Sequence, residues 1–92
     1  MPRTDLKLIE IDEIEKTEKI DEIANFIKND WKKINFGAEP YLNAMLEIEN
    51  IADNYHLEMG DSIVRYFLGN ASTYRGENAR IVKKRLNKLL EK

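Results

Sequence analysis

The stretch TEKIDEIANFIKNDWKKI, residues 17–34, decides the fold, because its apolar side chains recur at intervals of three and four residues. This recurrence places them on one face of an α-helix, where they can be buried together. The apolar positions are Ile20, Ile23, Ala24, Ile27, Trp31 and Ile34. With Thr17 or Asp12 as its N-cap, the pattern predicts a helix that reaches Ile34.

The segment after Gly37 predicts a second helix, which is the most periodic of the chain. Pro40 suits the first helical turn, because the backbone N–H that proline lacks has no partner there. Residues 41–55 have one apolar face and one polar face. The apolar positions are Tyr41, Ala44, Met45, Ile48, Ile51, Ala52 and Tyr55. We therefore expect a continuous helix from Pro40 to Tyr55, followed by a turn at residues 56–60.

Two shorter patterns predict helices in the last third of the chain. Asp61 or Ser62 can accept the free amides at the start of an apolar segment, residues 63–68. The final helix is expected to begin near Glu77. Its inward positions are Ala79, Val82, Leu86 and Leu89 or Leu90.

The N-terminal residues have an ambiguous pattern. Leu6, Leu8 and the isoleucines that follow partly alternate, which favours an extended arm, whereas the Glu-rich surroundings favour a helix. The sequence therefore predicts an acidic arm or short helix at residues 1–16 and a single helical domain at residues 17–92. The expected fold class is all-α, a small four-helix bundle-like domain with an additional N-terminal helix or arm.

A chain of 92 residues with 42% hydrophobic and 35% charged residues has room for one hydrophobic core. Domains of this size are often marginally stable alone, so we expect a homo-oligomer. The chain contains no cysteine, which excludes disulfides and thiolate metal sites. It has neither an apolar run long enough to span a membrane nor an export signal at its start, so we expect a cytoplasmic protein without a membrane partner.

The formal charge is unevenly distributed, although the net charge is only −2. Residues 1–30 carry 5 Lys/Arg and 9 Asp/Glu, residues 31–74 carry 3 and 6, and residues 75–92 carry 7 and 2. This balance is neither that of an acidic nucleic-acid mimic nor that of a uniformly basic nucleic-acid binder. We expect the acidic first third to contact the basic last helix, within one chain or between copies.

A short polar segment, residues 70–76, carries more chemistry than a simple connection requires. It precedes a helix N-terminus, whose free N–H groups and partial positive charge attract anions. Arginine side chains beside it can add charge-assisted hydrogen bonds to the same ligand. The residues that would contact such a ligand are Asn70, Ser72, Thr73, Tyr74, Arg75 and Arg80.

The same segment also has a purely structural interpretation. Ser72 or Thr73 would cap the last helix. Asn70 or Gly69 would end the preceding helix, and Tyr74 would pack on the core with its hydroxyl group in solvent. Both interpretations remain open at the level of the sequence.

The last helix carries a basic ridge, because Arg80, Lys84 and Lys88 lie four residues apart along one side. Such a ridge can contact nucleic-acid phosphates. It can equally remain solvated or pair with the acidic first third of the chain. No base-reading motif accompanies it, so nucleic acid is an alternative partner that we do not favour.

The sequence contains neither a catalytic nor a metal-binding pattern. His56, the only histidine, lies near Glu58 and Asp61 without a recognisable ligand spacing, which is typical of a structural or exposed histidine. No phosphate-binding glycine loop, nucleophile elbow or HExxH motif occurs. We therefore expect a protein that is not an enzyme and that has no cofactor. Trp31 and Phe36 flank a glycine turn and could present an edge to a partner.

Two blocks of the sequence resemble a family of small proteins carried by phages and integrative elements. The first block, residues 36–45, reads FGAEPYLNAM, and the second, residues 66–80, reads YFLGNASTYRGENAR. With the basic tail, the resemblance covers roughly residues 31–90. Tyr74 stands where the family pattern also has Trp. The resemblance implies a phage or mobile-element origin in a bacterial host, and it brings no activity with it.

These features lead to one favoured function and two alternatives. The favoured function is a non-enzymatic phage or mobile-element protein that binds a host protein, as an anti-defence or host-takeover inhibitor would. The first alternative is a binder of small anionic ligands or nucleotides that uses residues 70–76. The second is a nucleic-acid accessory protein that uses the basic last helix.

Overall fold

The structure, a computed structural model, describes residues 8–91. Helices hold 55% of the described residues and strands hold 5%. No helix in this range has both the length and the apolar character that crossing a membrane requires. The elements, in chain order, are α1 (Ile11–Ile14), α2 (Ile20–Asp30), α3 (Glu39–Met45), β1 (Asn54–Tyr55), β2 (Glu58–Met59), α4 (Gly60–Gly69) and α5 (Glu77–Leu90).

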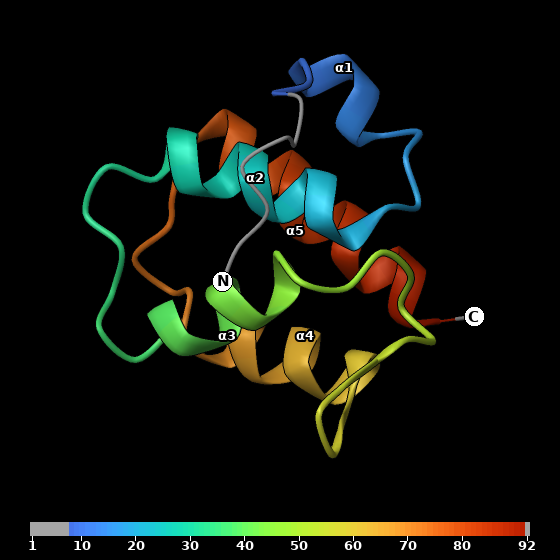
Figure 1. The fold of residues 1–92 in the computed structure, drawn as a ribbon. Helices are drawn as coiled ribbons and strands as arrows, with labels where there is room; N and C mark the ends of the chain where they lie inside the picture. Colours follow the sequence, from blue (N-terminus) through green and yellow to red (C-terminus); the bar gives the residue numbers. More distant parts are fainter. Residues whose placement is uncertain (1–7, 92) are drawn as a thin grey trace.

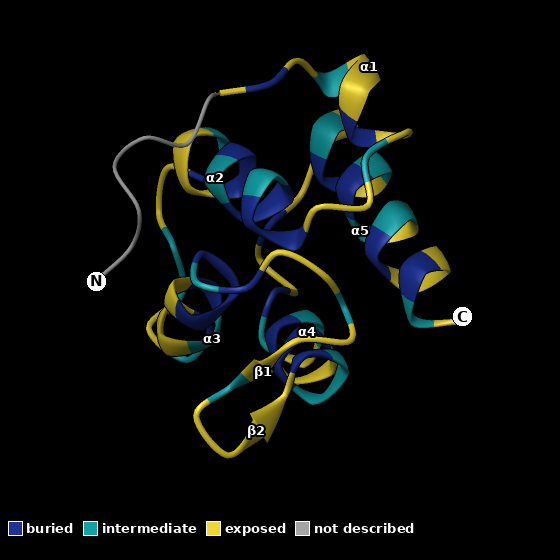
Figure 2. Ribbon diagram, turned by 45° about the vertical axis from the view of Figure 1, so that its right-hand side comes forward, coloured by how far each residue is buried: buried dark blue, intermediate teal, exposed yellow. Residues whose placement is uncertain are grey.

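The helices form two layers around one core (Figure 1). α2 and α5 pack together in one layer, α3 and α4 pack together in the other, and α1 packs against α5. The buried sides of the helices face inward (Figure 2). Each helix contributes buried side chains to this core. One example from each helix, in order from α1 to α5, is given by Ile14, Ile27, Leu42, Phe67 and Leu86.

The segment expected as an arm at residues 1–16 is described only from Leu8 onward, and residues 1–7 lie outside the described range. Within it, Ile9 and Ile14 are buried in the core. The expected contact between the N-terminal third and the last helix is present within one chain. Arg85 makes it by donating hydrogen bonds to the backbone carbonyls of Thr17, at 2.9 Å, and Lys16, at 3.3 Å.

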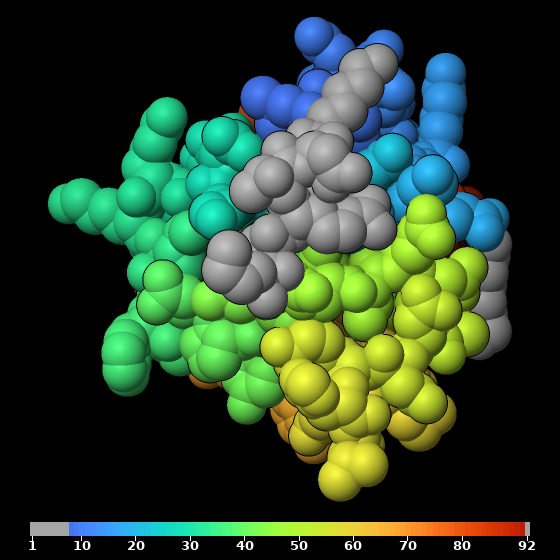
Figure 3. Space-filling view, viewed as in Figure 1, coloured from blue at the N-terminus to red at the C-terminus, as the bar shows by residue number. Residues whose placement is uncertain are grey.

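A short hairpin corrects the expected all-α class. β1 and β2 form an antiparallel pair in which Asn54 is opposite Met59 and Tyr55 is opposite Glu58. At the turn between them, His56 has a left-handed backbone conformation with a φ of 57°. The hairpin projects at the lower end of the molecule (Figure 3). A mostly helical fold is therefore confirmed, but the protein is not strictly all-α.

The helix predicted from Pro40 to Tyr55 is wrong after Met45, where α3 ends. The polar residues of its expected outer face instead bind the backbone of the turn that follows. Asp53 accepts hydrogen bonds from the N–H groups of Glu49 and Asn50, at 3.0 and 2.9 Å. Such local side-chain bonds compete with helical ones, which explains why the apolar periodicity did not decide this segment.

α2 has the predicted buried spacing but ends at Asp30 rather than at Ile34. The backbone becomes extended at Trp31, whose N–H still donates to the carbonyl of Ile27 at 2.8 Å. The indole ring of Trp31 lies in the core, where it is 6% exposed.

The N-caps predicted for α2 are wrong. Lys19 occupies the N-cap position and makes no side-chain capping bond. The N–H of Ile20 donates instead to the backbone carbonyl of Glu49 at 2.9 Å. Thr17 accepts a hydrogen bond from Lys19, and Asp12 lies in α1. A carbonyl from a distant turn therefore satisfies the first amide of α2.

α4 begins at Gly60, before the predicted caps Asp61 and Ser62, so that prediction is also wrong. The start is fixed by a close approach of backbone to backbone. A Cβ atom at Gly60 would lie 2.6 Å from the carbonyl oxygen of Ile51 and 2.7 Å from that of Asp53. Only glycine leaves enough space at this position.

Replacing Gly60→Ala should lower the free energy of unfolding by about 1–3 kcal/mol, because the methyl group would collide with two backbone carbonyls. Gly69→Ala is a matched control in the same helix, since no atom lies within 4 Å of a Cβ added there. It should be neutral or stabilise by about 0.4–1 kcal/mol. Urea unfolding followed by circular dichroism measures both, and equal stabilities would contradict the described packing around Gly60.

Candidate functional site

Two segments that are distant in the sequence meet beside Trp31 and enclose a groove. Residues 30–33 comprise the last residue of α2 and the three that follow it, and residues 73–75 precede α5. The groove has a volume of about 480 Å³. We call it the cationic groove, and its lining residues are Asp30, Trp31, Lys32, Lys33, Thr73, Tyr74 and Arg75.

The wall of the groove is built from stacked aromatic rings. Trp31 and Tyr74 have ring centroids 5.1 Å apart and planes inclined by 22°. Phe67 meets the indole edge-on, with centroids 6.2 Å apart. Tyr74 is only 2% exposed, so its ring joins the two segments and offers no free face to a ligand. The choice between Trp and Tyr at position 74, which the resemblance raised, therefore affects packing within the core.

The hydroxyl group of Tyr74 does not lie in solvent, contrary to the structural interpretation of the sequence. It donates a hydrogen bond to Oδ2 of Asp30 at 2.8 Å, while Nδ2 of Asn78 donates to Oδ1 at 3.1 Å. Burial raises the pKa of Tyr74 well above its usual range, and the hydrogen bond to Asp30 and the charge of Asp30 act in the same direction. Tyr74 is thus held as a neutral phenol.

Cationic side chains gather around these rings. Lys32, Lys33 and Arg75 line the groove, and Nζ of Lys83 lies 5.9 Å from the centroid of the Tyr74 ring. Burial lowers the pKa of Lys83, and the positive charge of Arg75 lowers it further. No carboxylate within residues 8–91 forms an ion pair with these four cations. The groove therefore has an excess of positive charge.

Asn70 and Gly76, at the two ends of the 70–76 segment, have structural roles. Asn70 ends α4, as expected, and its side chain donates to the carbonyl of Tyr66 at 2.8 Å. Ser72 and Thr73 are exposed and neither caps α5, so that capping prediction is wrong. The N-cap is Gly76, whose φ of 112° favours glycine.

The structure separates Arg80 from the groove. Its guanidinium forms an ion pair with Glu77 at 2.7 Å, within the first turns of α5. The other ridge residues, Lys84 and Lys88, are exposed and line a smaller hollow of about 210 Å³ together with Glu15. The basic ridge is thus distinct from the cationic groove and has an acidic neighbour of its own.

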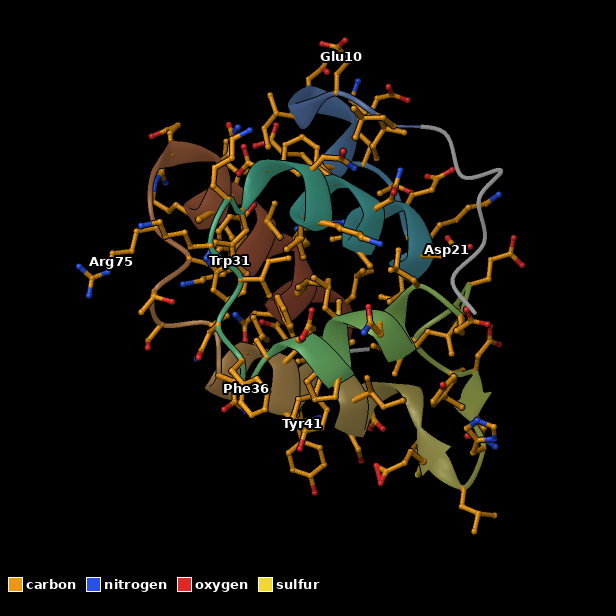
Figure 4. The ribbon with its side chains drawn as sticks, turned by 60° about the vertical axis from the view of Figure 1, so that its left-hand side comes forward. Glu10, Asp21, Trp31, Phe36, Tyr41 and Arg75 are labelled. Atoms are coloured by element: carbon orange, nitrogen blue, oxygen red, sulfur yellow. The ribbon has the colours of Figure 1, made fainter. Side chains whose placement is uncertain are left out.

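A second candidate surface is aromatic. Phe36 is 89% exposed, in the segment between α2 and α3. Tyr41 of α3 and Tyr66 of α4 have ring centroids 5.5 Å apart, and Tyr66 is 52% exposed. Figure 4 shows Phe36 and Tyr41 at the same end of the molecule, with Trp31 and Arg75 above them. We call Phe36, Tyr41 and Tyr66 the aromatic surface.

Sequence analysis missed several groups of the groove. Lys32 and Lys33 were hidden because a helix running to Ile34 would have made them ordinary solvated positions. Asp30 and Asn78 were missed because their bonds join residues far apart in the chain. The feature of the sequence that could have identified the two lysines is their position directly after Trp31, between a helical pattern and a glycine turn.

His56 lies in the hairpin turn, with its ring 4.4 Å from that of Tyr55. Within residues 8–91, no three or more His, Cys, Asp or Glu side chains come together in a group that could hold a metal ion.

Tyr74→Phe should lower the free energy of unfolding by about 1–3 kcal/mol at neutral pH, because a partly buried carboxylate loses a hydrogen-bond donor. Tyr66→Phe is the control, since Tyr66 is half exposed and its hydroxyl makes no hydrogen bond within residues 8–91. Chemical unfolding followed by circular dichroism measures both variants. An unchanged Tyr74→Phe protein would show that the bond to Asp30 does not stabilise the fold.

The same pair should differ in alkaline solution. Because the Tyr74 pKa is raised by folding, the unfolded chain ionises first, and the stabilisation is lost as the pH rises above about 10. Unfolding midpoints measured at increasing pH should therefore fall less for Tyr74→Phe than for the wild type. Parallel decreases in the two proteins would contradict the raised pKa.

The arrangement offers charge and hydrogen-bond donors to an anion in the cationic groove and an apolar contact at the aromatic surface. Both surfaces are built on the segment between α2 and α3 and on the residues that pack against it. No protein-family model, curated protein or solved structure matches the chain.

Proposed function

We propose that this chain is a non-enzymatic binding domain that docks on another protein through its aromatic surface. The observation that carries the proposal is the exposure of two aromatic rings, Phe36 at 89% and Tyr66 at 52%. Tyr41 packs on Tyr66 and lies at the same end of the molecule as Phe36 (Figure 4). Aromatic side chains in this position lose contact with water only when a partner covers them. They are also the residue types that contribute most to protein–protein interfaces.

The backbone around Phe36 supports this role, because it is held on both sides. Nδ2 of Asn35 donates to the carbonyl of Asn70 at 2.9 Å, and the N–H of Gly37 donates to Oδ1 of Asn35 at 3.3 Å. A Cβ atom at Gly37 would lie 2.8 Å from Oδ1 of Asn70, so the two segments approach closely. An apolar anchor on a fixed backbone loses little conformational entropy on binding.

The partner class that we propose takes up the resemblance in sequence, which implies an origin in a phage or mobile element of a bacterial host. Phe36 and Tyr41 belong to one block that resembles phage and mobile-element proteins, and Tyr66 belongs to the other. We therefore propose a host protein as the partner, bound as an anti-defence or host-takeover inhibitor would bind it.

Phe36→Ala should abolish capture of a host protein by the immobilised chain, because it removes the central apolar contact. Its own stability should change by less than about 0.5 kcal/mol, since the side chain is exposed. The measurement is quantitative mass spectrometry of proteins retained from a bacterial lysate by the wild type and by the variant. A genuine partner is one whose purified form binds the wild type and not Phe36→Ala.

Leu57→Ala is the matched control, because Leu57 is a fully exposed apolar residue in the hairpin. A partner lost equally from both variants would indicate general adhesion and would reject the proposal. Light scattering of the isolated proteins addresses self-association. A wild-type oligomer that Phe36→Ala converts to a monomer would show that a second copy covers the aromatic surface, and the host-protein proposal would then fail.

A further inference from the structure

We propose that the cationic groove is a binding site for a small phosphate-bearing molecule, held by Lys32, Lys33 and Arg75. This inference is independent of the aromatic surface, because it depends on charge and on different side chains. It assigns a ligand to a site formed by two segments, and two of its three cations, Lys32 and Lys33, were not among the residues expected from the sequence to contact a ligand.

The balance of charge in the groove favours an anion. Three of the lining residues are cations, and Asp30 is the only lining carboxylate. Both oxygens of Asp30 already accept hydrogen bonds, from Tyr74 and from Asn78. Asp30 is therefore occupied in joining α2 to α5, and it neutralises at most one of the three positive charges.

The side chain of Arg75 is available to such an anion. Its Nε donates to the backbone carbonyl of Ser72 at 3.3 Å, which fixes the inner part of the guanidinium. Its terminal amino groups have no acceptor among residues 8–91. Arg75 extends outward on the side of the molecule where Trp31 lies (Figure 4). Two terminal amino groups can bind two phosphate oxygens at once.

The position of Lys83 close to Arg75 provides a second line of support. Its ammonium group lies over the Tyr74 ring and is affected by the charge of Arg75, so two cations are close together without a carboxylate partner in the described part of the chain. Folding brings these like charges together at a cost in free energy. A bound anion would remove that cost, which favours occupancy of the groove.

The geometry also limits what the site can recognise. A volume of about 480 Å³ is sufficient for a diphosphate or a nucleotide. The rings of Trp31 and Tyr74 are buried against each other, at 6% and 2% exposure, so neither can stack on a nucleobase. Recognition must come from the phosphate groups, with the exposed hydroxyl of Thr73 as a further donor.

Isothermal titration calorimetry with pyrophosphate, ATP and adenosine tests the proposal on the complete chain. Pyrophosphate and ATP should bind with similar affinity, and adenosine should not bind. Substituting Lys32→Gln, Lys33→Gln and Arg75→Gln together should weaken pyrophosphate binding by more than about tenfold, because charge-assisted hydrogen bonds are lost. Absence of pyrophosphate binding to the wild type at low salt would overturn the proposal.

Lys84→Gln combined with Lys88→Gln is the matched control, since these two lysines are exposed on α5 outside the groove. This variant should bind pyrophosphate nearly as well as the wild type. If it loses as much affinity as the groove variant, the anion responds to overall charge and the proposed site is wrong. Phe36→Ala should bind pyrophosphate normally, so failure of either proposal can be distinguished from failure of the other.

Nuclear magnetic resonance of the lysine side chains gives a readout that does not depend on affinity. The negative charge of a phosphate in the groove favours the protonated form of Lys83 and opposes the effect of Arg75, so the Lys83 pKa should rise when pyrophosphate is added. The pKa of Lys88, on the ridge, serves as the reference. An unchanged Lys83 pKa in the presence of saturating pyrophosphate would place the anion elsewhere and reject the site.

Discussion

The architecture depends on the contact between Trp31 and Tyr74. Trp31 directly follows α2, and Tyr74 lies shortly before α5, so their stacked rings connect the two helices of one layer. Phe67 of α4 meets the indole edge-on, which brings the second layer to the same point. Apolar burial supplies most of the stabilisation here, and the bond from Tyr74 to Asp30 fixes how the rings are oriented. Both candidate surfaces are located relative to this junction.

Some of the fold could be predicted from the sequence because local periodicity and tertiary packing agree. The buried positions of α2 and the start of α5 at Glu77 follow the predicted pattern. The segment after Met45 could not be predicted in this way. Its polar side chains, above all Asp53, bind nearby backbone amides more favourably than a helix would allow, and a hydrophobic pattern does not report such bonds.

The candidate site was predictable only in part, for a different physical reason. Sequence analysis selected Tyr74 and Arg75 for their chemistry and Trp31 for its position beside a turn, and the structure brings all three to one groove. It did not select Lys32 or Lys33, because the apolar spacing predicted a helix through both positions, whereas α2 ends at Asp30. Trp31 stacks on Tyr74, and the hydroxyl of Tyr74 donates to Asp30, 44 positions before it. Local spacing does not report contacts between residues so far apart in the chain.

The carbonyl of Glu49 accepts the hydrogen bond of the first amide of α2, and this bond couples the local unfolding of two regions. The turn formed by residues 46–53 supplies this acceptor, so loss of the turn also leaves the beginning of α2 without a partner for Ile20. The two regions should exchange their amide hydrogens with solvent as one cooperative unit, although they are distant in sequence. Local unfolding of the turn at residues 46–53 should therefore also open the first turn of α2.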